Sequence, residues 1–447
     1  MLSVISITPT KLRNTLLIVL CATSARSFAQ INSPYSRYGL GDINPSGNVV
    51  NKGMGGLSAA YMDHQSVNFL NPASYSRIGL TTFDVSLEIE NRTLKNTAKT
   101  DKYSTANLTF NYLTVGLPLN KKGTWGMAFG LRPVSKINYK VESRERLNVA
   151  QTLKDSILSL YEGSGGSYKG FIGTGVKFGG LSLGANVGYH FGQEDLSTRR
   201  IFINDSVAYY KSNSANSISF GGFFAETGLQ YDAQLGKSGY FRFGATYGLK
   251  HNLSAEKDVI RETFSYNGTS GAPEQLDSVY KATGIAGNIK FPQNYSVGFV
   301  IGKTDTLTRT EKWMIGVQYE GTKWDDYSFY GQKDQVKNSY MFRVGGQLTP
   351  DLLGPNLFSR LTYRAGFYFG KDYVNIKNTQ LPVFAVTLGA GIPVKRRSYY
   401  SNQFTTINLG LEFGKRGNNS SLVTENIFKL HIGLSLSDIW FQKRRYD

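Results

Sequence analysis

The sequence predicts an all-β fold, a transmembrane antiparallel β-barrel of about 14 strands whose lumen is plugged by an N-terminal hatch. Three observations indicate this fold: an export signal, an unusual composition, and alternation of apolar and polar residues along most of the chain. Glycine accounts for 49 of the 447 residues, aromatic residues for 13% and charged residues for 18%. Soluble domains carry about 25% charged residues, so an ordinary soluble protein fits these proportions poorly.

Residues 1–29 have the features of a secretory signal peptide. Lys11 and Arg13 supply positive charge, residues 16–20 form a short apolar core, and Ala29 ends a cleavage site of small residues. The only cysteine, Cys21, lies in this segment. We therefore expect a mature chain without a thiol, which excludes a disulfide framework, a zinc-thiolate site and a nucleophilic cysteine.

Residues 30–80 form the second predicted unit, the hatch. This stretch is rich in glycine, asparagine, serine and proline and shows no sustained alternation, yet it carries many large apolar residues. Such a segment needs a place to bury these side chains, and before the first strand of a barrel that place is the lumen.

Residues 81–447 form the third predicted unit, the outer-membrane β-barrel. In residues 181–192 every odd position is apolar and every even position is polar or small. Side chains on a strand point alternately to opposite faces, so this pattern predicts one wholly apolar face. Alternation alone does not tell a lumen-facing polar side from a solvent-facing one. Segments of about 10 residues or more, long enough to cross a bilayer when tilted, favour the barrel and give about 14 to 16 strands. Further alternating segments begin at Phe83, Trp125, Phe241, Tyr295, Trp313, Leu361, Ile407 and Leu430.

The connections between strands predict which end of the barrel faces outward. Short turns at 120–123, 179–180 and 236–239 are expected on the periplasmic side. Longer connections are expected outside, at 141–167, 194–216, 252–290 and 325–337. In the first of these, Val149, Leu153, Ile157 and Leu160 fall at helical spacing, which predicts a short amphipathic helix near the barrel mouth.

The predicted hatch carries a resemblance to a known family. The run Gly53–Asp63, followed by Asn71-Pro72-Ala73, resembles the N-terminal hatch of FadL-type outer-membrane transporters of long-chain fatty acids and aromatic hydrocarbons. In that family a glycine-rich run precedes an N-P-A motif just before the first barrel strand. Residues 33–42 resemble a variant of this family found in gliding and gut-type Gram-negative bacteria.

The resemblance implies a 14-stranded barrel whose hatch blocks the lumen. Family members capture a hydrophobic ligand at the extracellular loops, hold it in a pocket against the hatch and release it sideways through a gap at a kinked strand. By resemblance, the hatch architecture rests on Gly55, Gly56, Asn71, Pro72 and Ala73. The apolar hatch residues expected near a ligand pocket are Met54, Leu57, Phe69, Leu70 and Tyr75.

Other motifs have plainer interpretations. The four histidines are dispersed without ligand spacing, and His190 and His431 fall on the polar face of alternating segments, where we expect them to face the lumen. Glu88 and Glu90 are assigned to the same face. The glycines at 53–56 lack the G-x-G-x-x-G spacing of a dinucleotide site, and no G-x-S-x-G elbow with catalytic partners is present. We therefore expect no enzyme, catalytic residue, cofactor or metal.

These inferences favour passive uptake of small hydrophobic molecules such as fatty acids across the outer membrane of a Gram-negative bacterium. The alternative is a scaffold or shuttle in surface protein export, because the type IX secretion shuttle protein is similar to FadL-type barrels. A barrel enzyme, as in outer-membrane phospholipases, is a further alternative. The net charge of +18 favours contact with outer-membrane lipid and lipopolysaccharide over nucleic acid. Other expected partners are a hydrophobic small-molecule ligand, the barrel assembly machinery and secretion partners.

Overall fold

The computed structural model describes residues 33–44, 47–96, 102–120, 122–149, 152–203, 210–269, 271, 273–305, 311–394 and 403–438. The predicted signal peptide and Cys21 lie outside these residues, so the interpretation of that segment stays a prediction. Among the described residues, no helix is long and apolar enough to span a membrane.

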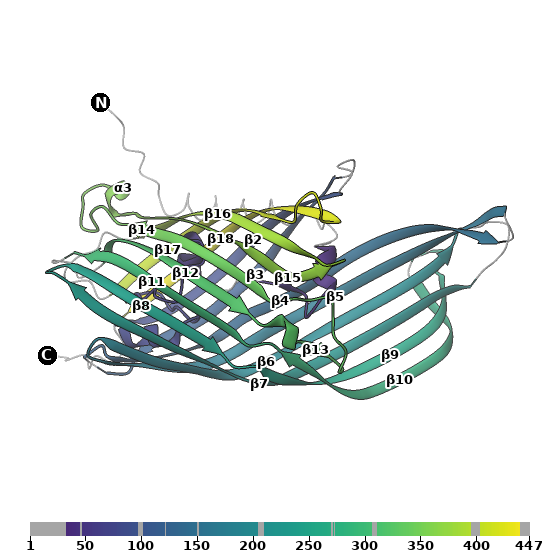
Figure 1. The fold of residues 1–447 in the computed structure, drawn as a ribbon, viewed down its shortest axis with the longest axis horizontal. Coiled ribbons are helices and arrows are strands. Elements are labelled where there is room, and N and C mark those ends of the chain that lie inside the picture. The colour runs from purple at the N-terminus through teal and green to yellow at the C-terminus, as the bar shows by residue number, and fades with distance from the viewer. Residues whose placement is uncertain are drawn as a thin grey trace, which may run out of the picture.

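The chain forms a closed antiparallel barrel of 14 strands, as the sequence predicts (Figure 1). The last strand pairs with the first along the full length of both, which closes the ring. Two crossings are each interrupted once and so carry two labels, β8 with β9 and β10 with β11. The strands are β2 (Thr81–Asn96), β3 (Lys102–Pro118), β4 (Trp125–Val149), β5 (Thr152–Phe178), β6 (Leu181–Phe202), β7 (Lys211–Leu235), β8 (Gly239–Gly248), β9 (His251–Tyr266), β10 (Pro273–Phe291), β11 (Asn294–Thr304), β12 (Glu311–Thr322), β14 (Ser339–Leu348), β15 (Thr362–Ile376), β16 (Thr379–Pro393), β17 (Gln403–Arg416) and β18 (Val423–Asp438).

The barrel is apolar outside and polar inside. On β6 the side chain of Val187 is 54% exposed, whereas the alternating Asn186 and His190 are almost fully buried. His431, Glu88 and Glu90 are buried in the same way, so the lumen-facing assignment of these residues is confirmed. Alternation alone does not tell whether the polar side of the strands faces a lumen or solvent. The exposed apolar face shows that the polar side faces the lumen, because a water-soluble sheet would bury its apolar face instead.

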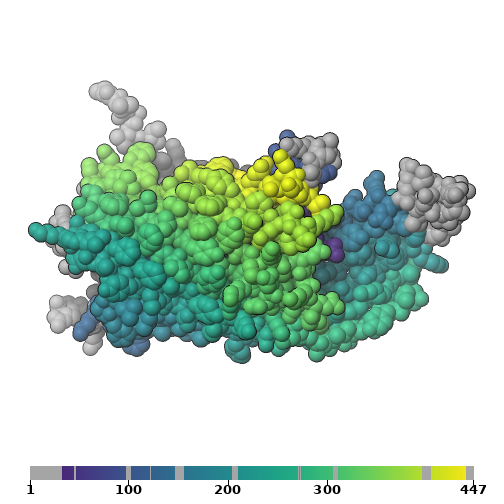
Figure 2. Space-filling view, viewed as in Figure 1, coloured from purple at the N-terminus to yellow at the C-terminus, as the bar shows by residue number. Residues whose placement is uncertain are grey.

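Six of the strands continue far beyond the ring. Figures 1 and 2 show β4, β5, β6, β7, β9 and β10 projecting on one side as a curved sheet. The connections expected at 141–167, 194–216 and 252–290 are therefore mostly strand. We call the end with this extension the hairpin end, and the opposite end, with the turns at 119–124, 179–180 and 236–238, the turn end.

The helix predicted over residues 148–161 is wrong. Residues 152–161 belong to β5, and Tyr161, Leu160 and Ser159 pair with residues 141–143 of β4. Helical spacing of four apolar residues is a local signal, and the β4–β5 ladder satisfies the backbone of both strands over a much longer stretch.

Residues 33–44 and 47–80, here called the N-terminal segment, lie within the ring of strands. They form the short elements η1 (Pro34–Arg37), β1 (Asp42–Ile43), α2 (Val49–Gly53) and η2 (Pro72–Arg77). The helix α2 contacts β15 to β18, while η2 contacts β3 to β7 on the other side of the ring. The two remaining helices, η3 (Trp324–Asp326) and α3 (Leu357–Arg360), and the short strand β13 (Ser328–Phe329) belong to the later connections.

Candidate functional site

The glycine turn of the N-terminal segment packs directly against the barrel wall. Gly55 and Gly56 both have positive φ, at 67° and 82°, a conformation that favours glycine. A Cβ on Gly55 would lie 2.8 Å from the carbonyl oxygen of Phe367, and a Cβ on Gly56 would lie 2.4 Å from the Arg343 guanidinium. Arg343 donates from Nη1 to the Gly55 carbonyl oxygen at 3.0 Å. The two glycines therefore let the backbone reach the wall.

The motif Asn71-Pro72-Ala73 starts the second turn of the segment. The Asn71 side chain caps η2 by accepting a hydrogen bond from the Ala73 backbone N–H at 3.1 Å. Its amide nitrogen donates to the carbonyl oxygens of Ala59 at 2.5 Å and Leu229 at 3.3 Å. One side chain thus joins η2, the preceding turn and strand β7.

The five apolar residues expected near a ligand pocket occupy different environments. Met54 and Leu57 are buried in one cluster together with Tyr61, Val300 and Met314. Phe69 and Tyr75 are buried in a second cluster, against which Leu70 packs. Leu70 also lines a cavity inside the lumen. Contact of these residues with a ligand stays a prediction.

Buried ion pairs hold the segment to the barrel. Lys52 of α2 donates to Glu88 of β2 at 2.8 Å. Asp42 of β1 accepts from Arg92 at 2.6 Å and from Arg416 at 2.9 Å. Burial by itself would raise the pKa of Asp42, but the two arginines outweigh this effect and lower the pKa to about 2. Removing one partner of such a buried group costs about 3–5 kcal/mol, because the other charge is left uncompensated.

Sequence reasoning assigned no role to Arg92 or Arg416. Arg92 also pairs with Glu90 at 2.6 Å and with Glu425 at 2.9 Å, so it joins β1, β2 and β18. The available signal was a charged residue at an inward position of an alternating segment. That signal places a charge in the lumen but does not say which residue it pairs with.

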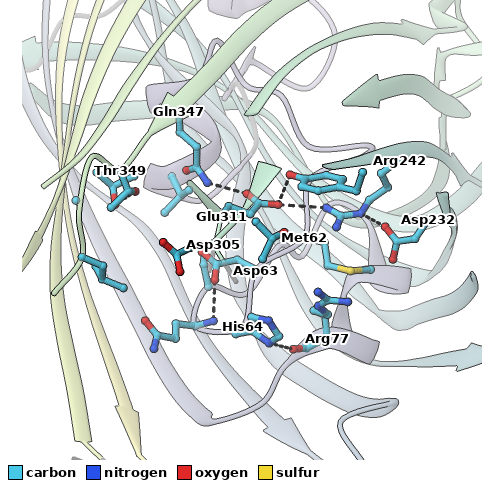
Figure 3. A pocket seen from close by; sticks show the side chains of 18 of the residues that line it. Met62, Asp63, His64, Arg77, Asp232, Arg242, Asp305, Glu311, Gln347 and Thr349 are labelled. Carbon is cyan, nitrogen blue, oxygen red and sulfur yellow. Dashed lines mark hydrogen bonds and ion pairs between the residues drawn. The ribbon is translucent and has the colours of Figure 1, made fainter. Parts of the chain in front are cut away.

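A cavity of about 690 Å³ opens at the turn end of the barrel, and we call it the turn-end cavity (Figure 3). On one wall, Arg242 pairs with Asp232 at 2.5 Å and with Glu311 at 3.6 Å. On the side of the N-terminal segment, His64 contacts the carbonyl oxygen of Arg77 at 3.0 Å through Nδ1. Burial lowers the pKa of His64, so this imidazole is neutral near pH 7.

A second cavity, of about 260 Å³, lies in the lumen, and we call it the lumen cavity. Its lining is mixed: Leu70, Val134 and Phe291 lie beside charged groups such as Lys169 and Glu226. It also reaches Thr109 of β3 and the stretch of β4 around Pro133.

The lumen cavity adjoins a split in the barrel wall. Strands β3 and β4 pair only over Leu113–Pro118 and Gly126–Leu131, whereas β3 continues to pair with β2 and β4 with β5 far beyond. Pro133 lacks a backbone N–H, and the register of β4 against β5 shifts directly after it. Both features lie just beyond the point where β4 stops pairing with β3, and past it the Lys136 side chain of β4 donates to the Thr109 hydroxyl of β3 at 3.2 Å.

The N-terminal segment bridges this split. Asp42 and Ile43 of β1 pair antiparallel with Lys136 and Ser135 of β4. The backbone N–H of Asn44 donates to the Val134 carbonyl oxygen at 3.0 Å, and the Asn44 side chain reaches Asn111 of β3 at 3.4 Å. The segment therefore contacts both borders of the split.

The chain matches the family described as BamG over residues 11–447. The chain belongs to the BamG family. A search among curated proteins finds no match.

Solved transport barrels share the fold of this BamG-family protein. The P. putida toluene transporter TodX is 15% identical, with 89% of this chain and 99% of that chain covered and a TM-score of 0.55. A Pseudomonas aeruginosa FadL homologue is 10% identical, with coverages of 90% and 100% and a TM-score of 0.57. For the Ralstonia pickettii toluene transporter TbuX the identity is 12%, the coverages are 88% and 98% and the TM-score is 0.52. The resemblance to FadL-type barrels is confirmed at the level of fold.

Proposed function

We propose that this protein is an outer-membrane barrel of a Gram-negative bacterium that takes up small hydrophobic molecules passively, with the N-terminal segment acting as the hatch. The observation that carries the proposal is the split between β3 and β4, which the lumen cavity reaches and β1 bridges. The related structures are toluene transporters and a FadL homologue, which supports the same class of cargo, fatty acids or small aromatic hydrocarbons.

The wall next to the split faces lipid. On β3 the outward side chains of Leu108 and Leu113 are exposed, as expected of residues in contact with acyl chains. A hydrophobic molecule that leaves through the split therefore enters the bilayer and avoids water. This route lowers the cost of crossing, because apolar surface is not re-exposed to water on the way out.

The hatch needs to move for passage. In the structure β1 lies across the split and is held by the Asp42 ion pairs. A ligand that binds the open arrangement of the hatch more tightly than the closed one shifts the population toward the open arrangement. This shift requires no energy source. The split is therefore the exit, and β1 is its gate.

Uptake in cells tests the proposal. A strain lacking the protein is compared with the same strain carrying it on a plasmid, using a radiolabelled long-chain fatty acid and labelled toluene in separate assays. We expect faster uptake of at least one compound when the protein is present, with no change for a small sugar of similar mass. Equal rates for both hydrophobic compounds with and without the protein would refute the uptake function.

A second candidate function is a scaffold in surface protein export. It is favoured by the extension at the hairpin end, which offers a large surface beyond the ring of strands (Figure 2). Quantifying surface-exposed proteins in the deletion strain separates the two functions. Loss of surface proteins with unchanged uptake supports the scaffold, whereas slower uptake with a normal surface proteome supports the transporter.

A further inference from the structure

Arg364 of β15 is a buried cation on the wall of the turn-end cavity. The residue is only 8% exposed, and its side chain lines the cavity. Its Nε donates to the Gln347 side-chain oxygen at 3.2 Å, and its Nη1 donates to the Asn408 side-chain oxygen at 3.1 Å. Both acceptors are neutral amides, so these bonds leave the positive charge of Arg364 uncompensated.

Arg364 differs in this respect from the other buried arginines. Six arginines of the described residues are buried. Five of them form an ion pair with a carboxylate at 2.5–2.9 Å: Arg92 and Arg416 with Asp42, Arg132 with Glu226, Arg242 with Asp232 and Arg343 with Glu320. Arg364 pairs with no carboxylate of a described residue. A buried charge is costly unless an opposite charge lies beside it, so an anion bound next to Arg364 would remove this cost.

Two carboxylates of the cavity that could compensate Arg364 have donors of their own. Glu311 accepts from the Gln347 amide nitrogen at 2.8 Å and faces Arg242 at 3.6 Å (Figure 3). The Gln347 amide therefore stands between Glu311 and Arg364. Asp63 accepts hydrogen bonds within the N-terminal segment, from a tyrosine hydroxyl at 2.9 Å and from a backbone N–H at 3.1 Å. Neither carboxylate forms an ion pair with Arg364.

The wall beside Arg364 leaves room for its guanidinium. A Cβ on Gly391 of β16 would lie 3.0 Å from Arg364 Nη1 and 3.2 Å from Nη2. A Cβ on Gly53 of α2 would lie 3.5 Å from Arg364 Cβ, so the N-terminal segment packs against the aliphatic part of the side chain. Nη2 donates to no described residue. Guanidinium N–H groups bind carboxylate and phosphate oxygens in a fork, so the free side of Arg364 suits an oxyanion.

Other groups of the turn-end cavity suit the same ligand. The hydroxyls of Thr349 and Thr362 share a hydrogen bond of 2.9 Å, so the hydroxyl that accepts keeps its own hydrogen for another acceptor. Thr362 lies two positions before Arg364 on β15, so both side chains point to the same face of the strand. Among the described residues that line the cavity, six are cationic and four are carboxylates. The surplus of positive charge attracts an anion.

We propose that the turn-end cavity binds a small oxyanion, a carboxylate or a phosphate group, through the Arg364 guanidinium and the Thr362 hydroxyl. The cavity volume of about 690 Å³ is that of a site for a small molecule that carries such a group. Short turns are expected on the periplasmic side, so the ligand enters from the periplasm. The site shares no described lining residue with the lumen cavity, so anion binding and hydrophobic uptake can fail independently.

Calorimetric titration of the full-length protein in a nonionic detergent tests the site. Inorganic phosphate and acetate are titrated separately at constant ionic strength, set with sodium chloride. We expect at least one of them to bind the wild type, and to bind Arg364→Gln about tenfold more weakly or less, because a charge-assisted hydrogen bond is lost. Tighter binding of phosphate identifies a phosphate-bearing ligand, and tighter binding of acetate identifies a carboxylate.

Two further variants separate a bound anion from a general effect of charge. Thr362→Val removes a hydroxyl with little change of shape and should weaken binding about threefold. Arg199→Gln removes an arginine that pairs with Glu162 at 3.0 Å outside the turn-end cavity, and this variant should bind the anion as the wild type does. Saturating anion should raise the unfolding temperature of the wild type and of Arg199→Gln, but not that of Arg364→Gln.

Three results would overturn the proposal. The first is no binding of either anion to the wild type. The second is unchanged affinity in Arg364→Gln when circular dichroism shows that the variant is folded; if it does not fold, unchanged affinity in Thr362→Val has the same meaning. The third is equal weakening in Arg364→Gln and Arg199→Gln, which would show that the anion responds only to the net charge of the protein.

Discussion

Single residues decide how closely the N-terminal segment approaches the wall. Gly55 combines a positive φ with backbone oxygens so near that no side chain fits. Asp42 is a carboxylate held between two guanidinium groups that come from strands far apart in the sequence. Gly55 therefore supports a prediction about backbone strain, and Asp42 supports a prediction about charge.

Gly55→Ala should loosen the N-terminal segment more than the backbone strain of a positive φ would on its own. Gly123, in a turn, has a similar φ of 64° but nothing within 4 Å of an added Cβ. Gly123→Ala should cost about 1–2 kcal/mol of local strain. Gly55→Ala adds a clash with the backbone oxygens of Phe367 and Val344. Amide hydrogen exchange in residues 50–57 should therefore be faster than in the wild type in Gly55→Ala only, and equal exchange in both variants would contradict this account.

Asp42 should make the seating of β1 sensitive to acid. Its folded pKa is about 2 against an ordinary 3.8, so the stabilisation is complete above the ordinary value and is lost as pH falls through the folded one. Hydrogen exchange in residues 42–44, corrected for intrinsic rates, should show constant protection from about pH 7 to 4 and a fall below it. Asp42→Asn should lower the protection at neutral pH and remove the fall, and a wild-type-like acid profile in that variant would assign the titration to another carboxylate.

At the scale of elements, β1 and β4 form the pair with the clearest functional consequence. The pairing covers two residues, so it is far weaker than the ladders between full strands. Breaking it frees only a few backbone groups, which suits a contact that opens and closes. Local residues also change the course of other strands in the wall. Strand structure is interrupted at 249–250 and at 292–293, which includes Pro292, and the register of β4 against β5 shifts after Pro133.

Locking β1 onto β4 should stop uptake. Ile43 and Ser135 are directly paired, so Ile43→Cys with Ser135→Cys places two thiols at a distance suited to a disulfide. The wild-type chain has one cysteine, Cys21, in the predicted signal peptide, so competing thiols are not expected. Oxidation should abolish uptake of labelled fatty acid, and a reductant should restore it.

The matched control cross-links an intact part of the wall. Leu409 and Ile432 are paired in the β17–β18 ladder, so Leu409→Cys with Ile432→Cys adds the same chemistry without touching the split. This variant should transport equally in the oxidised and reduced states. Undiminished uptake through the oxidised Ile43–Ser135 lock would show that the β3–β4 split is not the exit.

At the scale of the whole molecule, the barrel buries its charges and exposes its apolar side chains. The lumen is filled by the N-terminal segment and by ion pairs such as Lys52 with Glu88, while large apolar side chains cover the outside. Only a membrane around the ring makes this distribution stable, because water outside would face the apolar surface. A polar substitution on the outer face should therefore lower the free energy of unfolding by an amount that depends on its depth in the membrane.

A lysine substituted on the outer face should destabilise the barrel more near the middle of the membrane than near its surface. Val187 lies near the middle of the crossing by β6 and is 54% exposed, and Leu235 is 52% exposed at the turn end of β7. In lipid vesicles, Val187→Lys should lower the free energy of unfolding by about 2–4 kcal/mol and Leu235→Lys by about 0–1 kcal/mol. Denaturant titration followed by tryptophan fluorescence gives both values. Equal, small effects would mean that Val187 does not face hydrocarbon.

The sequence by itself determined the barrel, its inward and outward faces and the position of the glycine turn and Asn71 in the N-terminal segment. These features depend on local rules: a period of two along a strand, and residue types with special backbone or capping behaviour. His190 and Glu88 were placed in the lumen for this reason. The same local rules misread residues 148–161, where helical spacing was overridden by pairing with a strand.

Only the tertiary structure decided the pairing of Asp42 with Arg92 and Arg416 and the split between β3 and β4. Each depends on which strands become neighbours and in which register, and on how far each ladder continues. Those properties arise when the whole ring closes, and contacts between residues hundreds of positions apart carry no signature in any short stretch of sequence.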